Sequence, residues 1–207
     1  MAGGLPAGRI ETLQIPYISL ADARGVSYWG AMNGPVLILP GLSSSGPEHW
    51  QSHWERAHPE FLRVEQDDWE RPRCADWIAH LEVAVRDAGP DAVLVAHSLA
   101  CTLVARWAET TEQTVRGALL VAPSDTEAPS YPGGTEGFKP MPRNHLPFPS
   151  IVVASTDDPY VTLERAEEFA RAWGSELVNI GPAGHVNSAS GLGDWPAGFA
   201  LLERLRR

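Results

Sequence analysis

The residue with the clearest chemical potential is Ser98, which stands in the sequence AVLVAHSLA at 92–100. An apolar run typical of a strand passes directly into a helical pattern, with the serine in the turn between them. In a nucleophile elbow this turn exposes the hydroxyl at the carboxyl end of the strand, and small residues are needed two positions to either side. Ala96 and Ala100 meet that need, although glycine is usual at both positions. An ordinary N-cap serine would give the same spacing, so the motif alone leaves both interpretations open.

Two later strand ends could supply the partners that a nucleophilic serine needs. The apolar run at 151–154 passes into a turn that contains Asp157 and Asp158, and the run at 176–180 passes into a loop that reaches His185. In open α/β sheets, side chains that follow the carboxyl ends of parallel strands form the site. The chain order nucleophile, acid, histidine is also one that serine hydrolases use. These placements predict a triad in which either carboxylate could be the acid.

Short apolar runs and helical patterns alternate along the chain and would hold these residues in place. The runs are rich in Val, Ile and Leu without alternation, which is typical of strands covered on both faces; they lie at 36–39, 92–96, 117–122 and 151–154. Segments with apolar residues on one helical face lie at 75–88, 99–109, 162–173 and about 194–205. This rhythm predicts an α/β fold with a mostly parallel sheet and helices on both faces.

The segment before the first parallel strand has a different pattern. The runs at 13–20 and 26–31 flank a glycine-bearing turn and predict an antiparallel hairpin, and residues 1–12 are expected to be a flexible tail. A length of 207 residues fits one domain. We therefore expect a single domain over 1–207.

The stretch 122–150 is rich in proline and predicts a long loop rather than a helix, a strand or an independent lid domain. It would leave the same sheet edge that carries the triad. Phe138, Met141 and Phe148 could then form an apolar wall for an acyl group, or they could pin the loop to the core.

Composition excludes several classes of partner. Asp and Glu number 26 against 16 Lys and Arg, giving a formal charge of −10, and no basic cluster offsets it. This charge opposes binding to nucleic acid or to an anionic membrane surface. Two cysteines exclude a disulfide framework, and neither a secretory signal nor a membrane-spanning run is recognisable. We expect a soluble cytoplasmic protein whose partner is a small molecule.

A metal site and an aromatic cleft are weaker alternatives. His49 and His53 have the i, i+4 spacing of zinc ligands on a helix, but the residue after the first histidine is Trp50 instead of the glutamate of metalloproteases. We expect no metal and no cofactor. The tryptophans at 50, 54, 69 and 195 could line a binding cleft, although packing in the core is the commoner role of such residues.

Several motifs together resemble the small serine hydrolases grouped with the retinoblastoma-binding protein nine, within the α/β-hydrolase superfamily. They are the elbow, LPGLSSSGPEHWQSHW at 39–54, STDDPYV at 155–161, GPAGHVN at 181–187 and GLGDWPAG at 191–198. The resemblance extends from about 36 to 205. It implies an α/β-hydrolase fold without a cap domain, with Ser98 as nucleophile and His185 as base. It also implies Asp158 as the acid, because this aspartate stands in D-x-x-V with Val161.

These roles predict hydrolysis of an ester-like or related acyl bond in a small substrate. The backbone N–H groups of Leu99 and Leu42 are expected to form the oxyanion hole, with Ser43 as the alternative to Leu42. A binding protein without catalysis, an acyltransferase and a small-peptide hydrolase are the other functions that this fold could carry.

Overall fold

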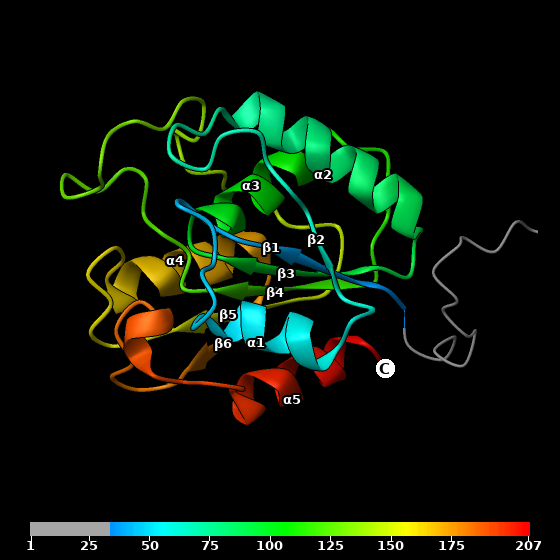
Figure 1. Ribbon diagram of the computed structural model, residues 1–207. Helices are drawn as coiled ribbons and strands as arrows, with labels where there is room; N and C mark the ends of the chain where they lie inside the picture. The colour runs from blue at the N-terminus through cyan, green and yellow to red at the C-terminus, as the bar shows by residue number, and fades with distance from the viewer. Residues whose placement is uncertain (1–33) are drawn as a thin grey trace, which may run out of the picture. The chain divides into compact units, whose positions relative to one another are not determined.

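The computed structural model describes residues 34–207. Six strands in this part of the chain form one sheet in the order β2-β1-β3-β4-β5-β6, and every neighbouring pair is parallel (Figure 1). The strands are β1 (Val36–Leu39), β2 (Leu62–Arg63), β3 (Val93–His97), β4 (Gly117–Val121), β5 (Ser150–Ala154) and β6 (Glu176–Asn179). The predicted parallel α/β sheet is therefore confirmed. The expected N-terminal hairpin and tail lie outside the described residues.

Helices connect the strands and cover both faces of the sheet. They are α1 (Trp50–Ala57), α2 (Cys74–Ala88), α3 (Leu99–Ala108), α4 (Leu163–Trp173) and α5 (Pro196–Leu205), with a short 3₁₀ turn at Ser188–Ser190. Residues of α2, α3 and α4 share one apolar core with one face of the strands. Residues of α1 and α5 share a second core with the other face (Figure 1).

The direction of the chain reverses between β1 and β3, and this reversal creates the place for a site. From β1 the chain crosses to β2 on one side and then returns to β3 on the other side. Loops at the carboxyl ends of these neighbouring strands consequently diverge and leave a crevice, which is where open α/β sheets bind ligands. Ser98 follows β3 directly, and the loop 40–49 follows β1.

The segment between β4 and β5 contains no helix or strand, as its prolines predict. No separate cap domain is evident in residues 34–207.

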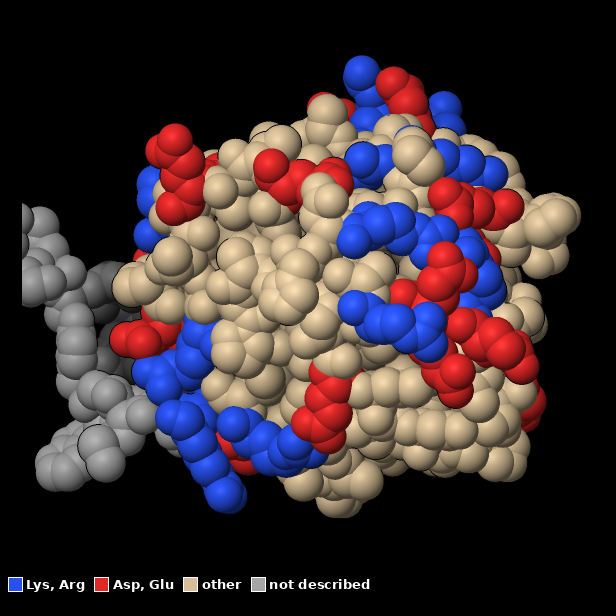
Figure 2. Space-filling view, turned by 180° about the vertical axis from the view of Figure 1, so that it is seen from behind, with Lys and Arg blue, Asp and Glu red and all other residues tan. Residues whose placement is uncertain are grey.

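On the face shown in Figure 2, Lys and Arg side chains lie among Asp and Glu side chains. None of the helices in the described part of the chain is long and apolar enough to cross a membrane.

Candidate active site

Ser98 lies at the predicted sharp turn between β3 and α3. Its backbone has φ 59° and ψ −122°, a region that residues with a side chain rarely occupy and that stores strain. The side chain makes no capping hydrogen bond to the helix, which excludes the N-cap role that the spacing left open. Ala96 and Ala100 are fully buried beside it, so larger side chains at these positions would separate the strand from the helix.

The structure brings Ser98, His185 and Asp158 together from three different strand ends. His185 Nε2 lies 2.8 Å from Ser98 Oγ, and His185 Nδ1 lies 2.9 and 2.8 Å from the two carboxylate oxygens of Asp158. A carboxylate only accepts hydrogen bonds, so Nδ1 carries a proton and Nε2 accepts the hydroxyl proton of Ser98. This arrangement can remove the serine proton as the oxygen attacks a carbonyl carbon.

Asp157 points away from the imidazole and holds the histidine loop instead. Its Oδ1 accepts hydrogen bonds of 2.7 Å from the Ser155 hydroxyl and from the Gly184 N–H. The Ser155 hydroxyl is the main reason that the pKa of Asp157 lies below its ordinary value, and the Gly184 N–H adds to it. Of the two carboxylates that the spacing left open, Asp158 is therefore the one in contact with His185.

The loop after β1 packs directly on the elbow. A Cβ on Gly41 would come within 2.8 Å of Ser98 Cβ and 2.9 Å of the His97 carbonyl oxygen, so only glycine fits. The Ser43 N–H donates to the Trp69 carbonyl at 2.9 Å and is thus already used. Within residues 34–207, the N–H groups of Leu42 and Leu99 have no hydrogen-bond acceptor, which keeps both available for an oxyanion.

A cavity of about 420 Å³ opens at this edge of the sheet and includes Ser98 and His185 in its lining. Most of the lining side chains are hydroxyls, imidazoles or tyrosines, and Leu42, Pro132 and Ala189 are apolar exceptions. The volume suits a small molecule.

His97 and Trp50 fix the backbone beside His185. His97 Nε2 lies 2.9 Å from the His185 carbonyl oxygen, and the Trp50 indole N–H donates to the Val186 carbonyl at 2.8 Å. Burial keeps the pKa of His97 well below its ordinary value, so this ring stays neutral. The sequence analysis gave no role to His97 and gave Trp50 only a place in a cleft or in the core.

Ser124 is a further residue that the sequence analysis missed. Its Oγ lies 2.9 Å from Ser98 Oγ, its side chain is buried, and it lines the cavity. Because Ser98 donates its proton to His185, Ser124 must be the donor in this contact. Its position just after β4, at the same sheet edge as the triad, was the signal that could have found it.

Ser124→Ala is expected to lower kcat/KM for an ester about 3- to 10-fold, because one hydrogen bond to the attacking oxygen is lost. Ser175→Ala is the matched control, since Ser150 Oγ and Ser175 Oγ form a second serine pair at 2.6 Å in another part of the protein. Steady-state kinetics of the two variants should separate these positions. Equal activity of the Ser124 and Ser175 variants would assign Ser124 to packing.

His49 and His53 do not form the zinc site that their spacing allowed. His49 Nδ1 accepts the Gln51 N–H and so caps α1, whereas His53 Nδ1 lies 2.9 Å from Asp194 Oδ1. Within residues 34–207 no group of three His, Cys, Asp or Glu residues has the geometry of a metal site. Burial, with help from the charge of Arg63, lowers the pKa of His49 from 6.5 to about 4.

Acidification is expected to destabilise the fold between pH 6.5 and 4 because of His49. The unfolded chain binds a proton in this window and the folded chain does not, so the free energy of unfolding falls as the pH falls. The shift from 6.5 to about 4 corresponds to about 3 kcal/mol. Urea unfolding at several pH values measures it. In His49→Asn, which retains a capping oxygen, the dependence should be shallower; an unchanged slope would contradict this origin.

The expectation of an acyl wall made by Phe138, Met141 and Phe148 is corrected by the structure. All three side chains are buried in the core, and none of them lines the cavity. The loop contains no helix or strand of its own that could bury its apolar side chains. These side chains therefore pack into the core of the domain, away from water. Their position matches the other interpretation, in which they pin the loop to the core.

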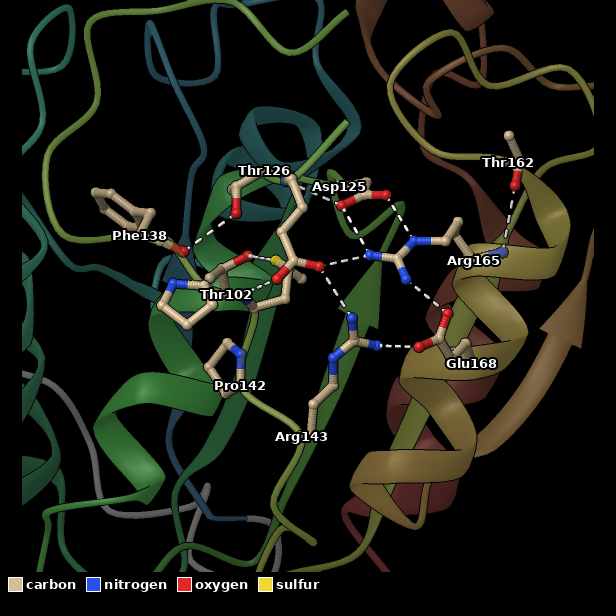
Figure 3. A network of polar contacts seen from close by, with 12 residues as sticks. Thr102, Asp125, Thr126, Phe138, Pro142, Arg143, Thr162, Arg165 and Glu168 are labelled. Atoms are coloured by element: carbon tan, nitrogen blue, oxygen red, sulfur yellow. Dashed lines mark hydrogen bonds and ion pairs between the residues drawn. The ribbon is translucent and has the colours of Figure 1, made fainter. Parts of the chain in front are cut away.

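Polar contacts also fasten this loop to α3 and α4 (Figure 3). The Thr102 hydroxyl of α3 donates to Met141 Sδ at 3.4 Å, and the Arg165 guanidinium of α4 donates to Asp125 at 2.7 Å. Within the loop, the Thr126 hydroxyl donates to the Phe138 carbonyl at 3.1 Å. Arg143 bridges Glu127 and Glu168 at 2.9 and 2.6 Å. Since Asp125 directly follows Ser124, this network holds the second serine of the site in place.

The tryptophans that could have lined a cleft lie in or against the core. Trp50, Trp54 and Trp195 pack together between α1 and α5, with ring centroids of neighbouring pairs 4.7 to 6.0 Å apart. Trp69 packs against the core on the opposite face of the sheet. None of the four lines the cavity.

Comparison with known families and structures bears on the family and the fold of the chain. The family model described as serine hydrolase matches residues 36–204. A structure described as a YdeN-like hydrolase from Pectobacterium atrosepticum is 29% identical, with a TM-score of 0.76 over 86% of this chain and 95% of that one. The ydeN gene product of B. subtilis is 20% identical, with a TM-score of 0.69 over 83% and 98% of the two chains.

A thermophilic esterase from Thermogutta terrifontis shares the fold at 16% identity, with a TM-score of 0.61 over 84% of this chain and 91% of that one. A search of curated proteins gives no significant match.

Proposed function

Because the chain belongs to the serine hydrolase family, whose model spans residues 36–204, we propose that it cleaves an ester-like acyl bond in a small substrate. The α/β-hydrolase fold is common to this chain and to its structural neighbours. The single observation that carries the proposal is the continuous chain of contacts from Ser98 through His185 to Asp158, with distances of 2.8 Å at both steps. The narrower grouping with the retinoblastoma-binding protein nine hydrolases is part of the same proposal and rests on the motifs at 155–161 and 181–198.

In the proposed mechanism, His185 takes the Ser98 proton while the serine oxygen attacks the substrate carbonyl carbon. Asp158 keeps the imidazole in the required tautomer and stabilises its protonated form. The N–H groups of Leu42 and Leu99 would donate to the oxyanion of the tetrahedral intermediate. His185 then protonates the leaving group, and water releases the acyl group by the same steps.

Release of p-nitrophenol from p-nitrophenyl esters tests this function. The series acetate, butyrate and octanoate separates acyl length from the presence of activity. We expect the short esters to be hydrolysed in preference to the octanoate, because Phe138, Met141 and Phe148 do not line the cavity and offer no apolar wall to a long acyl chain. A chain that hydrolyses none of these esters, and that also fails to transfer an acyl group to an added alcohol, would contradict the proposal.

A further inference from the structure

The half of the cavity beside His185 has to receive the leaving group. During ester cleavage the bond from the carbonyl carbon to the alcohol oxygen breaks, and His185 returns the serine proton to that oxygen. The alcohol must therefore lie within hydrogen-bond reach of His185 Nε2. Side chains around this imidazole, rather than those around the oxyanion donors, decide which alcohol can bind.

Three residues of the cavity lining lie next to His185, either in space or in the sequence. The Tyr160 ring lies 4.6 Å from the imidazole, measured between ring centroids, at a steep angle of 65°. Asn187 and Ser188 follow the histidine by two and three residues, and all three line the cavity. They come from two different loops, after β5 and after β6.

These three side chains carry hydrogen-bonding groups that have no partner within the part of the chain that the structure describes. Within residues 34–207, neither the Tyr160 hydroxyl nor the Ser188 hydroxyl has a hydrogen-bond partner. The Asn187 Oδ1 accepts the Ala189 N–H at 3.0 Å. The NH₂ group of Asn187 has no acceptor within residues 34–207. Two hydroxyls and one amide can thus donate to, and in part accept from, the hydroxyl groups of a ligand.

The cavity offers no counter-charge to a charged leaving group. Among the described lining residues there is no Asp, Glu, Lys or Arg, so an ionic group would lose water without gaining a counter-charge. The aromatic ring in contact with the imidazole is that of Tyr160. The face of that ring can contact the C–H groups of a hydroxylated ligand.

We infer that the alcohol part of the substrate is neutral and carries several hydroxyl groups, as in a monosaccharide or glycerol ester, and that Tyr160, Asn187 and Ser188 bind it. This inference rests on the proposed function. In the reaction the Ser98 oxygen binds the acyl carbon, the polyol leaves with the proton from His185, and water then converts the acyl-enzyme to the carboxylic acid and free serine.

The test compares two acetates of primary alcohols, methyl 6-O-acetyl-glucopyranoside and cyclohexylmethyl acetate, which share the acyl group and the ring size. We expect kcat/KM to be about 10- to 100-fold higher for the sugar ester, because two or three hydrogen bonds are made only to it. The assay uses the full chain, with p-nitrophenyl acetate as a reference substrate that has no polyol.

Tyr160→Phe and Ser188→Ala remove one hydroxyl each and keep the ring or the backbone. Each is expected to lower kcat/KM for the sugar ester about 3- to 10-fold more than for cyclohexylmethyl acetate. Thr114→Ala is the matched control, because Thr114 is an exposed hydroxyl residue that precedes β4 and does not line the cavity. It should change neither value.

Equal rates for the two acetates, or a loss in the variants that is the same for both, would overturn the inference while p-nitrophenyl acetate hydrolysis leaves the proposed function intact. No hydrolysis of any of the three esters would overturn the proposed function and the inference with it. A preference for the sugar ester that disappears in the Tyr160 and Ser188 variants supports both.

Discussion

Ser98→Ala is expected to lower the rate of ester hydrolysis by at least about 10³-fold, and His185→Ala by a similar factor. The serine supplies the attacking oxygen and the histidine its general base, and their atoms lie 2.8 Å apart. Residues of a triad act as a unit, so the double variant should be hardly slower than either single one. Initial rates with p-nitrophenyl acetate measure the loss.

A matched set of variants keeps this expectation separate from a loss of folding. Ser98→Gly removes the hydroxyl and relieves the strain of a residue at φ 59°, so it should unfold at the same temperature as the wild type or higher while remaining inactive. Ser175→Ala removes a partly buried hydroxyl elsewhere and should remain active. Near-native rates in folded Ser98→Ala would overturn its role as the nucleophile.

Asp158→Asn is expected to lower kcat about 10³- to 10⁴-fold, whereas Asp157→Asn should cost about 10-fold or less. An amide at 158 can donate to the imidazole and thereby favour the wrong tautomer, with the proton on Nε2 instead of Nδ1. An amide at 157 retains an oxygen that can still accept the Gly184 N–H. The two variants change the same group in adjacent residues, so each is the control for the other.

Kinetics of both variants with one activated ester, together with thermal unfolding, are sufficient for this comparison. Similar losses in the two variants would indicate that the carboxylates act only by holding their loop. A larger loss in Asp157→Asn would assign the acid to Asp157, against the contacts between Asp158 and His185.

Strand ends could be located from the sequence because local composition determines them. The run at 92–96 is fully apolar, and the turns that follow it and the strand at 151–154 contain the polar residues. Parallel pairing then places these turns at one edge, which is why Ser98, Asp158 and His185 could be named together. The choice of Asp158 over Asp157 as the acid required the resemblance, because adjacent side chains on a turn can point in opposite directions.

The contacts that the sequence could not give are those between loops. Whether Phe138 faces a ligand or the core depends on how the loop at 122–150 folds over α3, and proline content alone does not determine this path. The contact between Ser124 and Ser98 arises in the same way, from the curvature of a turn in which Ala122 has φ 50°. Side chains on irregular segments therefore required the structure.

The central claim is that Ser98 is the nucleophile, and labelling with a fluorophosphonate followed by peptide mass spectrometry tests it most directly. A fluorophosphonate reacts with a serine that a neighbouring base activates. The account predicts one adduct per chain, located on Ser98, and no adduct in Ser98→Ala. An adduct on Ser124, whose oxygen lies only 2.9 Å away, or an unlabelled folded chain would contradict it.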